Sequence, residues 1–279
     1  MGAPSTLIPK EMMSIYNVGT QCVQDLFDGV RVFENVKPVD VITYLVNMLS
    51  STDDTILDFF SGSATTAHAV MQLNAEDGGH RKFIMVQLPE ATDEKSEAYK
   101  AGYKTICEIG KERIRRAGQK IRNEQLGIRN AGDNSSLLAP NSSLDTGFRV
   151  LKCDTSNMKE VYYNPAEYEA SLFSSLEDNI KEDRTPEDLL FQVMLDLGIL
   201  LSSKIEETTI GGCKVFNVAD GFLYACFDNN ISDEVVTAIA KEQPYYAVFR
   251  DSGMASDSVM TNFDQIFASI SPSTVRKVL

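Results

Sequence analysis

The first 130 residues alternate between two hydrophobic patterns, which predicts strands interleaved with helices. Short β-prone runs occur at 55–60 and 82–88, and their length suits buried strands. Apolar residues at helical spacing predict helices at 39–50, 65–75 and 104–123. Strands that alternate with helices are typical of a parallel sheet with crossover helices. We therefore predict an α/β fold for this part of the chain.

The pattern changes after residue 130. Residues 131–146 are rich in Asn, Ser, Gly and Asp and have little to bury, which is typical of a linker. Strand and helix patterns resume beyond them. We predict a first domain at 1–130, a linker at 131–146 and a small α/β domain at 147–279.

The second domain contains clear start and stop signals. Thr185 and Pro186 suit the N-cap and the first residue of a helix, and Gly198 suits its end. Asp220-Gly221 lies between two apolar runs and predicts a hairpin. The remaining expectations are strands at 148–152, 213–218, 222–227 and 245–249, and helices that begin at Ser232 and Ser256.

A turn of small residues separates the first predicted strand from the helix at 65–75. Ser61, Gly62, Ser63 and Ala64 would let a ligand approach the backbone, and the N-terminus of the helix would face the same turn. The lysine of a phosphate-binding loop and the glycine pattern of dinucleotide enzymes are both missing from this stretch. A ligand without a polyphosphate therefore fits better. Ala64 is expected to keep ordinary backbone angles because its methyl group disfavours others.

Three segments with distinctive residues follow one another: Phe33 to Ile42 with its Lys37-Pro38 pair, the turn Asp58-x-Phe60-Ser61-Gly62-Ser63-x-Thr65-Thr66, and Arg81 to Glu90. Together they resemble the Lys-Pro motif, the S-adenosylmethionine (SAM) loop and the second strand of the amino-group DNA methyltransferases, in the permuted (beta-class) order. The resemblance implies a partial Rossmann-like, SAM-dependent methyltransferase fold followed by a small α/β C-terminal domain.

Later segments narrow the resemblance. The stretches 147–152, 184–190 and 248–251 resemble the C-terminal region of the Mod (modification) subunit of type III restriction-modification systems, an adenine-specific DNA methyltransferase that works with a Res helicase-nuclease. The family's catalytic Asp-Pro-Pro-Tyr motif is missing from this sequence. In the family it precedes the SAM loop by hundreds of residues, together with the target-recognition region. The resemblance implies that the chain is the C-terminal half of such an enzyme, and we expect it to be inactive by itself.

The resemblance also implies a contact for each part of SAM. Asp58 would meet the methionine ammonium, and Asn35 and Lys37 would lie near the carboxylate. Gln87 or Glu90 would accept hydrogen bonds from the ribose hydroxyls. The turn residues Ser61, Gly62, Ser63 and Thr65 would approach the methionine portion, and Phe60 and Pro38 would supply apolar walls. Neither a catalytic residue nor a metal ligand is expected.

A net charge of −14 argues against DNA binding over the whole surface. The resemblance implies three partners: double-stranded DNA, held mainly by the N-terminal half that is missing here, the Res subunit, and a second copy in a homodimer. The basic run from Lys104 to Arg129 is interpreted as a solvated helix with ion pairs such as Glu112 to Arg116. A stripe that tracks phosphates is the alternative.

Composition limits location and metal binding. No run reaches the ~18 apolar residues of a membrane span. The five cysteines are scattered without metal-ligand spacing, which indicates a reducing, cytoplasmic location and argues against a zinc site. His68, on the apolar helix, is expected to be packed rather than catalytic, and His80 is expected to be exposed.

Two other classes of function stay open. One is a non-catalytic dimerising scaffold with a remnant cofactor fold. The other is a different α/β enzyme, either a nucleotide-binding hydrolase or an NAD-linked oxidoreductase. Binding of SAM, ATP or NAD would discriminate among these hypotheses. Because a methyltransferase sheet usually has seven strands, we also expect open sheet edges and exposed apolar faces.

Overall fold

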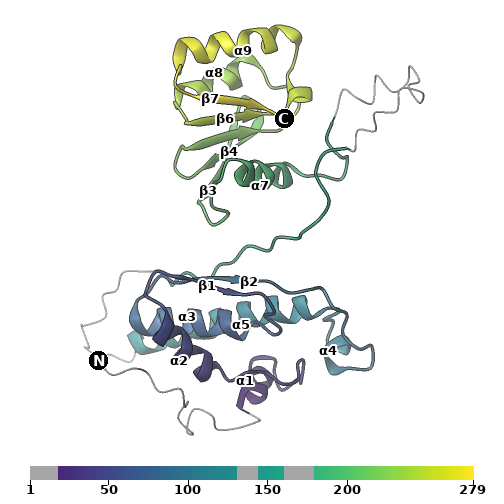
Figure 1. Cartoon of the computed structure of the whole chain (residues 1–279), viewed down its shortest axis with the longest axis vertical. Coiled ribbons are helices and arrows are strands. Elements are labelled where there is room, and N and C mark those ends of the chain that lie inside the picture. The colour runs from purple at the N-terminus through teal and green to yellow at the C-terminus, as the bar shows by residue number, and fades with distance from the viewer. Residues whose placement is uncertain (1–17, 131–143, 160–178) are drawn as a thin grey trace. The chain divides into compact units, whose positions relative to one another are not determined.

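The computed structural model describes residues 18–130, 144–159 and 179–279. The chain divides into two compact units, Met1–Val150 and Leu151–Leu279 (Figure 1). Both units combine helices with a sheet, so the predicted mixed α/β class is confirmed. None of the described helices is long and apolar enough to cross a membrane.

The first unit is built around two parallel strands joined by a helix. Strand β1 (Thr55–Asp58) pairs with strand β2 (Lys82–Met85), and helix α3 (Thr65–Asp77) connects them. The predicted strands are confirmed but shorter than expected, and the three predicted helices are present. The other described helices of this unit are α1 (Val18–Leu26), α2 (Val39–Leu49), α4 (Glu97–Lys100) and α5 (Ile106–Asn130), of which α1 and α4 were not predicted.

Helix α3 forms the centre of the first unit. It is buried along most of its length, and α2, α5 and β2 pack against it. Figure 1 shows α2, α3 and α5 on one side of the two strands. Phe83 points into this core, whereas Leu57 and Ile84 alternate to the other face and are 58% and 51% exposed. The expected exposed apolar face is therefore present on the β1–β2 pair.

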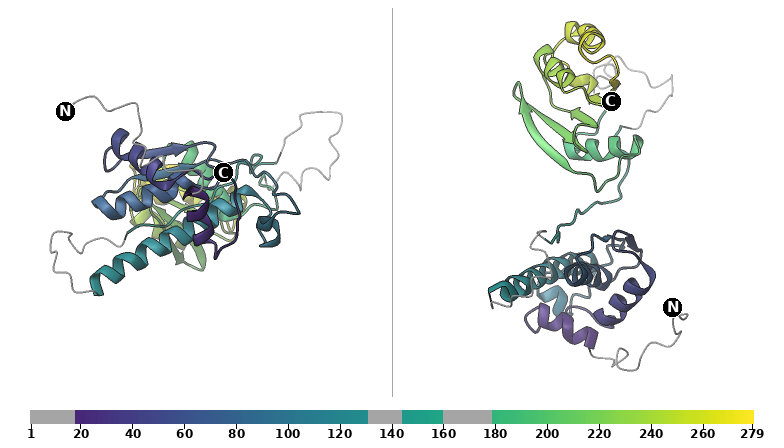
Figure 2. Two further views of the ribbon diagram at one scale, coloured as in Figure 1. Left: turned by 90° about the horizontal axis from the view of Figure 1, so that it is seen from below. Right: turned by 90° about the vertical axis from the view of Figure 1, so that its left-hand side faces the viewer.

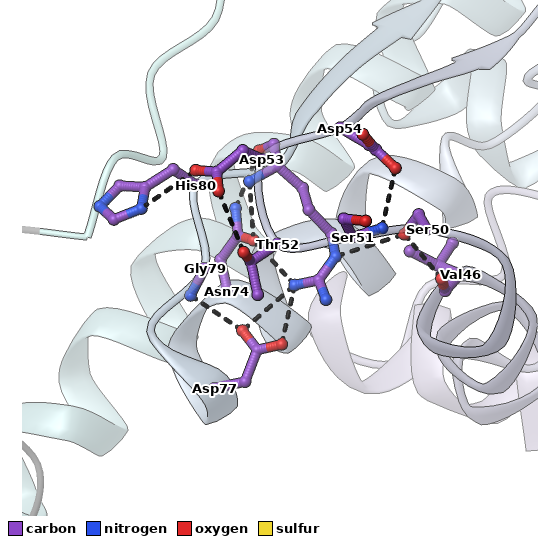
Figure 3. A network of polar contacts seen from close by, with 11 residues as sticks. Val46, Ser50, Ser51, Thr52, Asp53, Asp54, Asn74, Asp77, Gly79 and His80 are labelled. Carbon is purple, nitrogen blue, oxygen red and sulfur yellow. Dashed lines mark hydrogen bonds and ion pairs between the residues drawn. The ribbon is translucent and has the colours of Figure 1, made fainter. Parts of the chain in front are cut away.

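A polar network joins the amino ends of β1 and β2 (Figure 3). The buried Arg81 side chain donates to Asp77 at 2.8 Å, and its backbone N–H donates to Asn74 Oδ1 at 3.1 Å. Asn74 Nδ2 donates in return to the Arg81 carbonyl at 2.9 Å. The His80 N–H donates to the Thr52 carbonyl at 2.7 Å. These bonds tie the end of α3 to the loop before β1 and fix where both strands begin.

The second unit contains a five-stranded sheet with the order β3-β4-β5-β6-β7. Pairing is antiparallel from β3 to β5 and parallel from β5 to β7. The strands are β3 (Ile205–Ile210), β4 (Cys213–Val218), β5 (Leu223–Cys226), β6 (Tyr246–Phe249) and β7 (Val275–Val278). The helices that pack on them are α7 (Pro186–Asp196), α8 (Asp233–Lys241) and α9 (Asp257–Ile270).

Both faces of this sheet are covered. Figures 1 and 2 show α8 and α9 on one side and α7 on the other. Val215 and Phe249 belong to the buried cluster that includes residues of α8 and α9. Phe216 and Val248, one position away along each strand, belong to the cluster that includes residues of α7. Alternation along the strands thus supplies two apolar cores.

The predicted signals of the second unit are largely confirmed. Thr185 and Asp188 form a capping box at the start of α7. Asp220-Gly221 lies in the turn between β4 and β5, with positive φ at both residues. Ser232 occupies the N-cap of α8 as predicted, although its side chain makes no capping hydrogen bond. The predicted helix from Ser256 and the strand at 245–249 are also present, whereas β3 and β7 were not predicted.

The predicted strand at 148–152 is wrong. Residues 144–152 form no strand, and alternate side chains of the segment pack on the first unit instead. Leu144 and Phe148 contact its core, and the buried Thr146 lies against Gly118 of α5. Of residues 148–152 only Phe148 packs in this way, while Val150 and Leu151 are 58% and 50% exposed. Most of the predicted linker, residues 131–143, lies outside the described residues.

Replacing Arg81 by Met is expected to destabilise the first unit by about 2 kcal/mol, because the Asp77 carboxylate loses its charged donor in a largely buried network. Urea denaturation followed by circular dichroism measures the change in the free energy of unfolding. Lys82→Met, at the neighbouring exposed position, is the matched control. Equal stability of the two variants would contradict a stabilising role for the network.

Candidate functional site

Three of the segments singled out in the sequence meet at the carboxyl ends of β1 and β2. The Ser61 N–H donates to the Val86 carbonyl at 3.2 Å, and the Gly62 N–H donates to Gln87 Oε1 at 2.8 Å. The Phe33 ring lies 3.4 Å from the position that a Cβ on Gly62 would occupy. The fold therefore brings the segment around 33–38, the 61–65 turn and the end of the second strand together.

The turn contains two residues with left-handed backbone angles. Gly62 has a φ of 52° and Ala64 a φ of 61°. The Ala64 N–H donates to the Ser61 carbonyl at 2.7 Å, and the Ala64 side chain is buried. The expectation that Ala64 keeps ordinary angles is wrong. The left-handed conformation costs an alanine about 1 kcal/mol, so neighbouring contacts must hold it in place.

Asp58 links the end of β1 to the beginning of α3. One carboxylate oxygen accepts from the Thr66 hydroxyl at 2.6 Å, and the other accepts from the Phe60 N–H at 3.3 Å. The side chain is only partly buried. A negative charge beside the first turn of a helix also interacts favourably with the positive end of the helix dipole. Asp58 is thus held in place while part of its carboxylate stays open to a ligand.

Ser63 and Thr65 direct their hydroxyl groups into the protein. Arg113 of α5 donates from Nη1 to Ser63 Oγ at 2.8 Å and to Thr65 Oγ1 at 2.7 Å. Both Ser63 and Thr65 are buried. The hydroxyls are therefore engaged inside the unit, and a ligand above the turn would meet its backbone and Ser61.

Arg113 was not predicted as part of this site. Its side chain is fully buried, and burial lowers the pKa of the guanidinium to about 10, so the group stays charged at neutral pH. The basic run from Lys104 to Arg129 is interpreted from the sequence as a solvated helix with ion pairs. This is correct for Arg116, which pairs with Glu112 at 2.7 Å, and wrong for Arg113. Gly110, one turn earlier on the same face, is the sequence signal of a close approach that could have indicated burial.

The segment at 33–38, whose Phe33 ring lies against the turn, presents polar groups to solvent. Asn35 is exposed and has a φ of 54°. Lys37 is exposed and makes no ion pair with any described residue. Pro38 is the N-cap of α2, one position before the first helical residue. The Lys37 ammonium is therefore available to an anionic group.

Gln87 and Glu90 differ in how they are used. Gln87 Oε1 accepts from the turn, and its Nε2 donates to the Leu88 carbonyl at 3.3 Å. The Glu90 carboxylate is exposed and makes no hydrogen bond or ion pair with the described residues. Phe60 is 76% exposed and packs against Phe59, with ring centroids 5.3 Å apart. Glu90 thus offers an acceptor that the fold does not already use.

His68 is packed inside the unit, as predicted. It lies on α3, is 6% exposed, and its Nδ1 has no hydrogen-bond partner among the described residues. Burial, followed by the nearby Arg113 cation, lowers the pKa of His68 to about 3. The imidazole is therefore neutral at physiological pH. His80 is exposed, as predicted, with its side chain 3.7 Å from Asp53.

The exposed and partly exposed side chains of these segments offer the groups that a ligand with both charges and an apolar part would need. Asp58 and Glu90 offer carboxylates, Lys37 offers a cation, and the turn offers backbone close to Gly62. Among the described residues, no group of three or more His, Cys, Asp or Glu side chains could hold a metal ion.

Protonation of His68 is expected to make the protein less stable in mild acid. The unfolded chain takes up a proton below a pKa of ~6.5 while the folded chain does not until about 3, so stability is lost as pH falls. Between pH 7 and pH 5 the loss from this group is about 2 kcal/mol. Urea denaturation of His68→Gln should show a correspondingly shallower dependence on pH. His80→Gln, at the exposed histidine, should keep the dependence of the unmodified protein; identical pH profiles for both variants would refute the assignment.

Comparison with known proteins agrees with the geometry of the site. Residues 10–119 match the family N6_N4_Mtase, described as DNA methylase. The matched region contains the segment around 33–38, the 61–65 turn and the end of the second strand.

Similarity to individual proteins extends further along the chain. The chain is 30% identical over 225 residues to the Mod subunit of the type III restriction-modification enzyme EcoP15I of Escherichia coli, which is 80% of this chain and 31% of that subunit. It is 30% identical over 213 residues to the EcoPI Mod subunit of Escherichia phage P1, covering 76% of this chain and 30% of that subunit. It is 47% identical over 104 residues to the StyLTI Mod subunit of Salmonella typhimurium, covering 37% of this chain and 16% of that subunit.

The chain thus spans less than a third of the length of each of these relatives. Their shared description nevertheless agrees with the motifs found in the sequence. The predicted resemblance is confirmed: this chain is a relative of the Mod subunits of type III restriction-modification enzymes and carries a segment of the N6_N4_Mtase family of DNA methylases.

Proposed function

We propose that this chain is the SAM-binding portion of a site-specific DNA methyltransferase that modifies the N6 amino group of adenine in a type III restriction-modification system. The meeting of three motif segments at the carboxyl ends of two parallel strands supports it most. In open parallel sheets, ligands bind outside these ends of the strands. The β1–α3–β2 unit is the part of a Rossmann-like sheet that would hold the cofactor.

Each part of SAM has a partner in this proposal. Asp58 receives the methionine ammonium, and Asn35 and Lys37 receive the carboxylate. The turn residues approach the methionine portion through the Ser61 hydroxyl and the backbone of Gly62, Ser63 and Thr65, and Phe60 and Pro38 supply apolar walls. Bound SAM supplies the electrophilic methyl group, while these residues bind and orient it.

Glu90 is our choice for the ribose hydroxyls. The Gln87 side chain already accepts from Gly62 N–H, so its main role is to hold the turn. The exposed Glu90 carboxylate lies three residues further along and has no competing partner among the described residues. An ionised carboxylate is also a stronger acceptor than an amide.

The remaining parts of the activity would come from elsewhere in a longer enzyme. Without an Asp-Pro-Pro-Tyr motif, these 279 residues would bind SAM but not transfer its methyl group to DNA. The target adenine of such enzymes is flipped out of the duplex to reach the methyl donor. We further propose that the second unit contributes to homodimer formation and to contact with a Res subunit, and that the protein acts on double-stranded DNA in the cytoplasm.

Calorimetric titration with SAM tests the proposed site. We expect micromolar binding that weakens at least about tenfold in Asp58→Asn, because the amide still accepts from Thr66 but has lost its charge for the ammonium. Asp53→Asn, at an exposed position away from the turn, is the control. Binding to ATP or NAD instead of SAM would favour a different α/β enzyme. Absence of SAM binding in a folded, self-associating protein would favour the scaffold.

Glu90→Gln separates the two candidates for the ribose contact. We expect it to weaken S-adenosylhomocysteine binding by about tenfold, through loss of a charged acceptor. Glu94 is an exposed acid on the same loop, and the Glu94→Gln variant should bind S-adenosylhomocysteine as tightly as the unmodified chain does. Full affinity in Glu90→Gln would assign the ribose contact elsewhere, with Gln87 as the first candidate.

A further inference from the structure

We propose that Arg113 is a positioning residue that holds the 61–65 turn in the backbone geometry needed to receive the amino acid end of the cofactor. The consequence for ligand binding rests on the proposed function. The structural part, that Arg113 maintains the left-handed conformation of Ala64, stands without it.

The contacts of Arg113 bracket Ala64 on both sides. Its Nη1 donates to Ser63 Oγ at 2.8 Å and to Thr65 Oγ1 at 2.7 Å, and it lies 3.4 Å from the Ser63 carbonyl. One guanidinium nitrogen therefore contacts the residue before Ala64 and the residue after it. Rotation of the backbone at Ala64 would move these acceptors apart or away from the donor.

Ala64 needs such a restraint because its conformation is unfavourable for a residue with a Cβ. A φ of 61° at an alanine costs about 1 kcal/mol, whereas glycine adopts it freely. The Ser61 carbonyl accepts from the Ala64 N–H, which closes the turn from one side only. Gln87 holds Gly62, two residues earlier. Arg113 is thus the side chain that links the two neighbours of Ala64.

Helix α5 places the guanidinium rigidly. A Cβ on Gly110 would stand 3.4 Å from the Gly62 carbonyl and 3.6 Å from the Ala64 Cβ, so the helix passes close beneath the turn. Arg113 lies three residues later on the same helical face. Its side chain is fully buried, which leaves the guanidinium little freedom to move.

The charge of Arg113 is an unusual choice for a purely structural contact. Its Nε and Nη2 atoms are buried and have no hydrogen-bond partner among the described residues, and no described carboxylate forms an ion pair with it. Burial of an unpaired charge is costly. The cation also contacts Thr65, the first residue of α3, where the helix dipole is already positive. The combined potential favours an anionic group above the turn, such as the carboxylate of the amino acid end.

The backbone part of the proposal is tested in the full 279-residue chain by nuclear magnetic resonance. The Cα and Cβ chemical shifts of Ala64 report its backbone angles, and we expect them to leave the left-handed range in Arg113→Met. Arg115→Met, two residues along the same helix and largely exposed, is the matched control and should leave them unchanged. Ala64 shifts that stay left-handed in a folded Arg113→Met protein would overturn the proposal.

Ligand discrimination tests the consequence for the amino acid end. S-adenosylhomocysteine carries that end, whereas 5′-methylthioadenosine shares its adenosine and sulfur but lacks it. We expect Arg113→Met to weaken the binding of S-adenosylhomocysteine by about tenfold, as is typical when a supporting group that orients a binding site is lost. The affinity for 5′-methylthioadenosine should stay within about twofold of that of the unmodified chain. Equal loss of both ligands would indicate general destabilisation and would overturn this part.

A second substitution tests whether backbone strain at Ala64 connects the loss of Arg113 to the loss of ligand affinity. Ala64→Gly removes the need for a restraint, so adding it to Arg113→Met should restore most of the lost S-adenosylhomocysteine affinity. Failure of this rescue would overturn the proposed role. If Arg113→Met does not fold, Arg113→Lys, which keeps the charge but loses the planar fork, replaces it in the same comparisons. If the unmodified chain binds neither ligand, the proposed function fails, and the Ala64 chemical shifts still decide the role of Arg113.

Discussion

The guanidinium of Arg113 has lost all contact with water, and three oxygen atoms of one turn compensate for part of that loss. This interaction joins helix α5 to the beginning of α3 and therefore to the end of β1. The same junction contains Asp58, whose carboxylate accepts from Thr66 in the first turn of α3. The geometry of the strand–turn–helix junction thus depends on side chains that come from outside the turn. A flexible glycine-rich loop would need fewer such contacts, but an alanine at a left-handed position needs them.

Both strands of the first unit and its helices α2, α3 and α5 could be predicted because local pattern and tertiary packing agree there. The apolar run at 65–75 became a helix buried on most sides, and the runs at 55–60 and 82–88 became parallel strands at its edges. The turn was identified from its small residues and its resemblance to a known motif. Its conformation could not be predicted, because the intrinsic preference of Ala64 is overruled by contacts from residues far away in the sequence.

The wrong predictions, of a strand at 148–152 and of a solvated Arg113, also arise from contacts with residues far away in the sequence. Alternation predicts a strand at 148–152, but Phe148 packs with Leu144 against the core of the first unit, and Val150 and Leu151 stay about half exposed. Arg113 belongs to a run of charged residues, and its neighbours Arg115 and Arg116 behave as that composition suggests. The packing of α5 against α3 buries Arg113 and leaves Arg115 exposed, and Gly110 is a local sequence signal of that close approach. β7 lacks an apolar pattern because its side chains are exposed, and its pairing with β6 alone makes it a strand.

The two sheets differ in how completely their apolar surfaces are covered. The sheet of the second unit has helices on both faces and central strands that are almost fully buried. The β1–β2 pair has helices on one face, while Leu57, Ile84 and Val86 are about half exposed on the other. Exposed apolar surfaces of this kind are typically covered by another element, and parallel sheets in particular are usually buried on both faces. More than two thirds of each of the EcoP15I and EcoPI Mod subunits lies outside the region matched here. The described helices of the first unit therefore leave one apolar face of its strand pair uncovered, whereas the second unit has a complete core of its own.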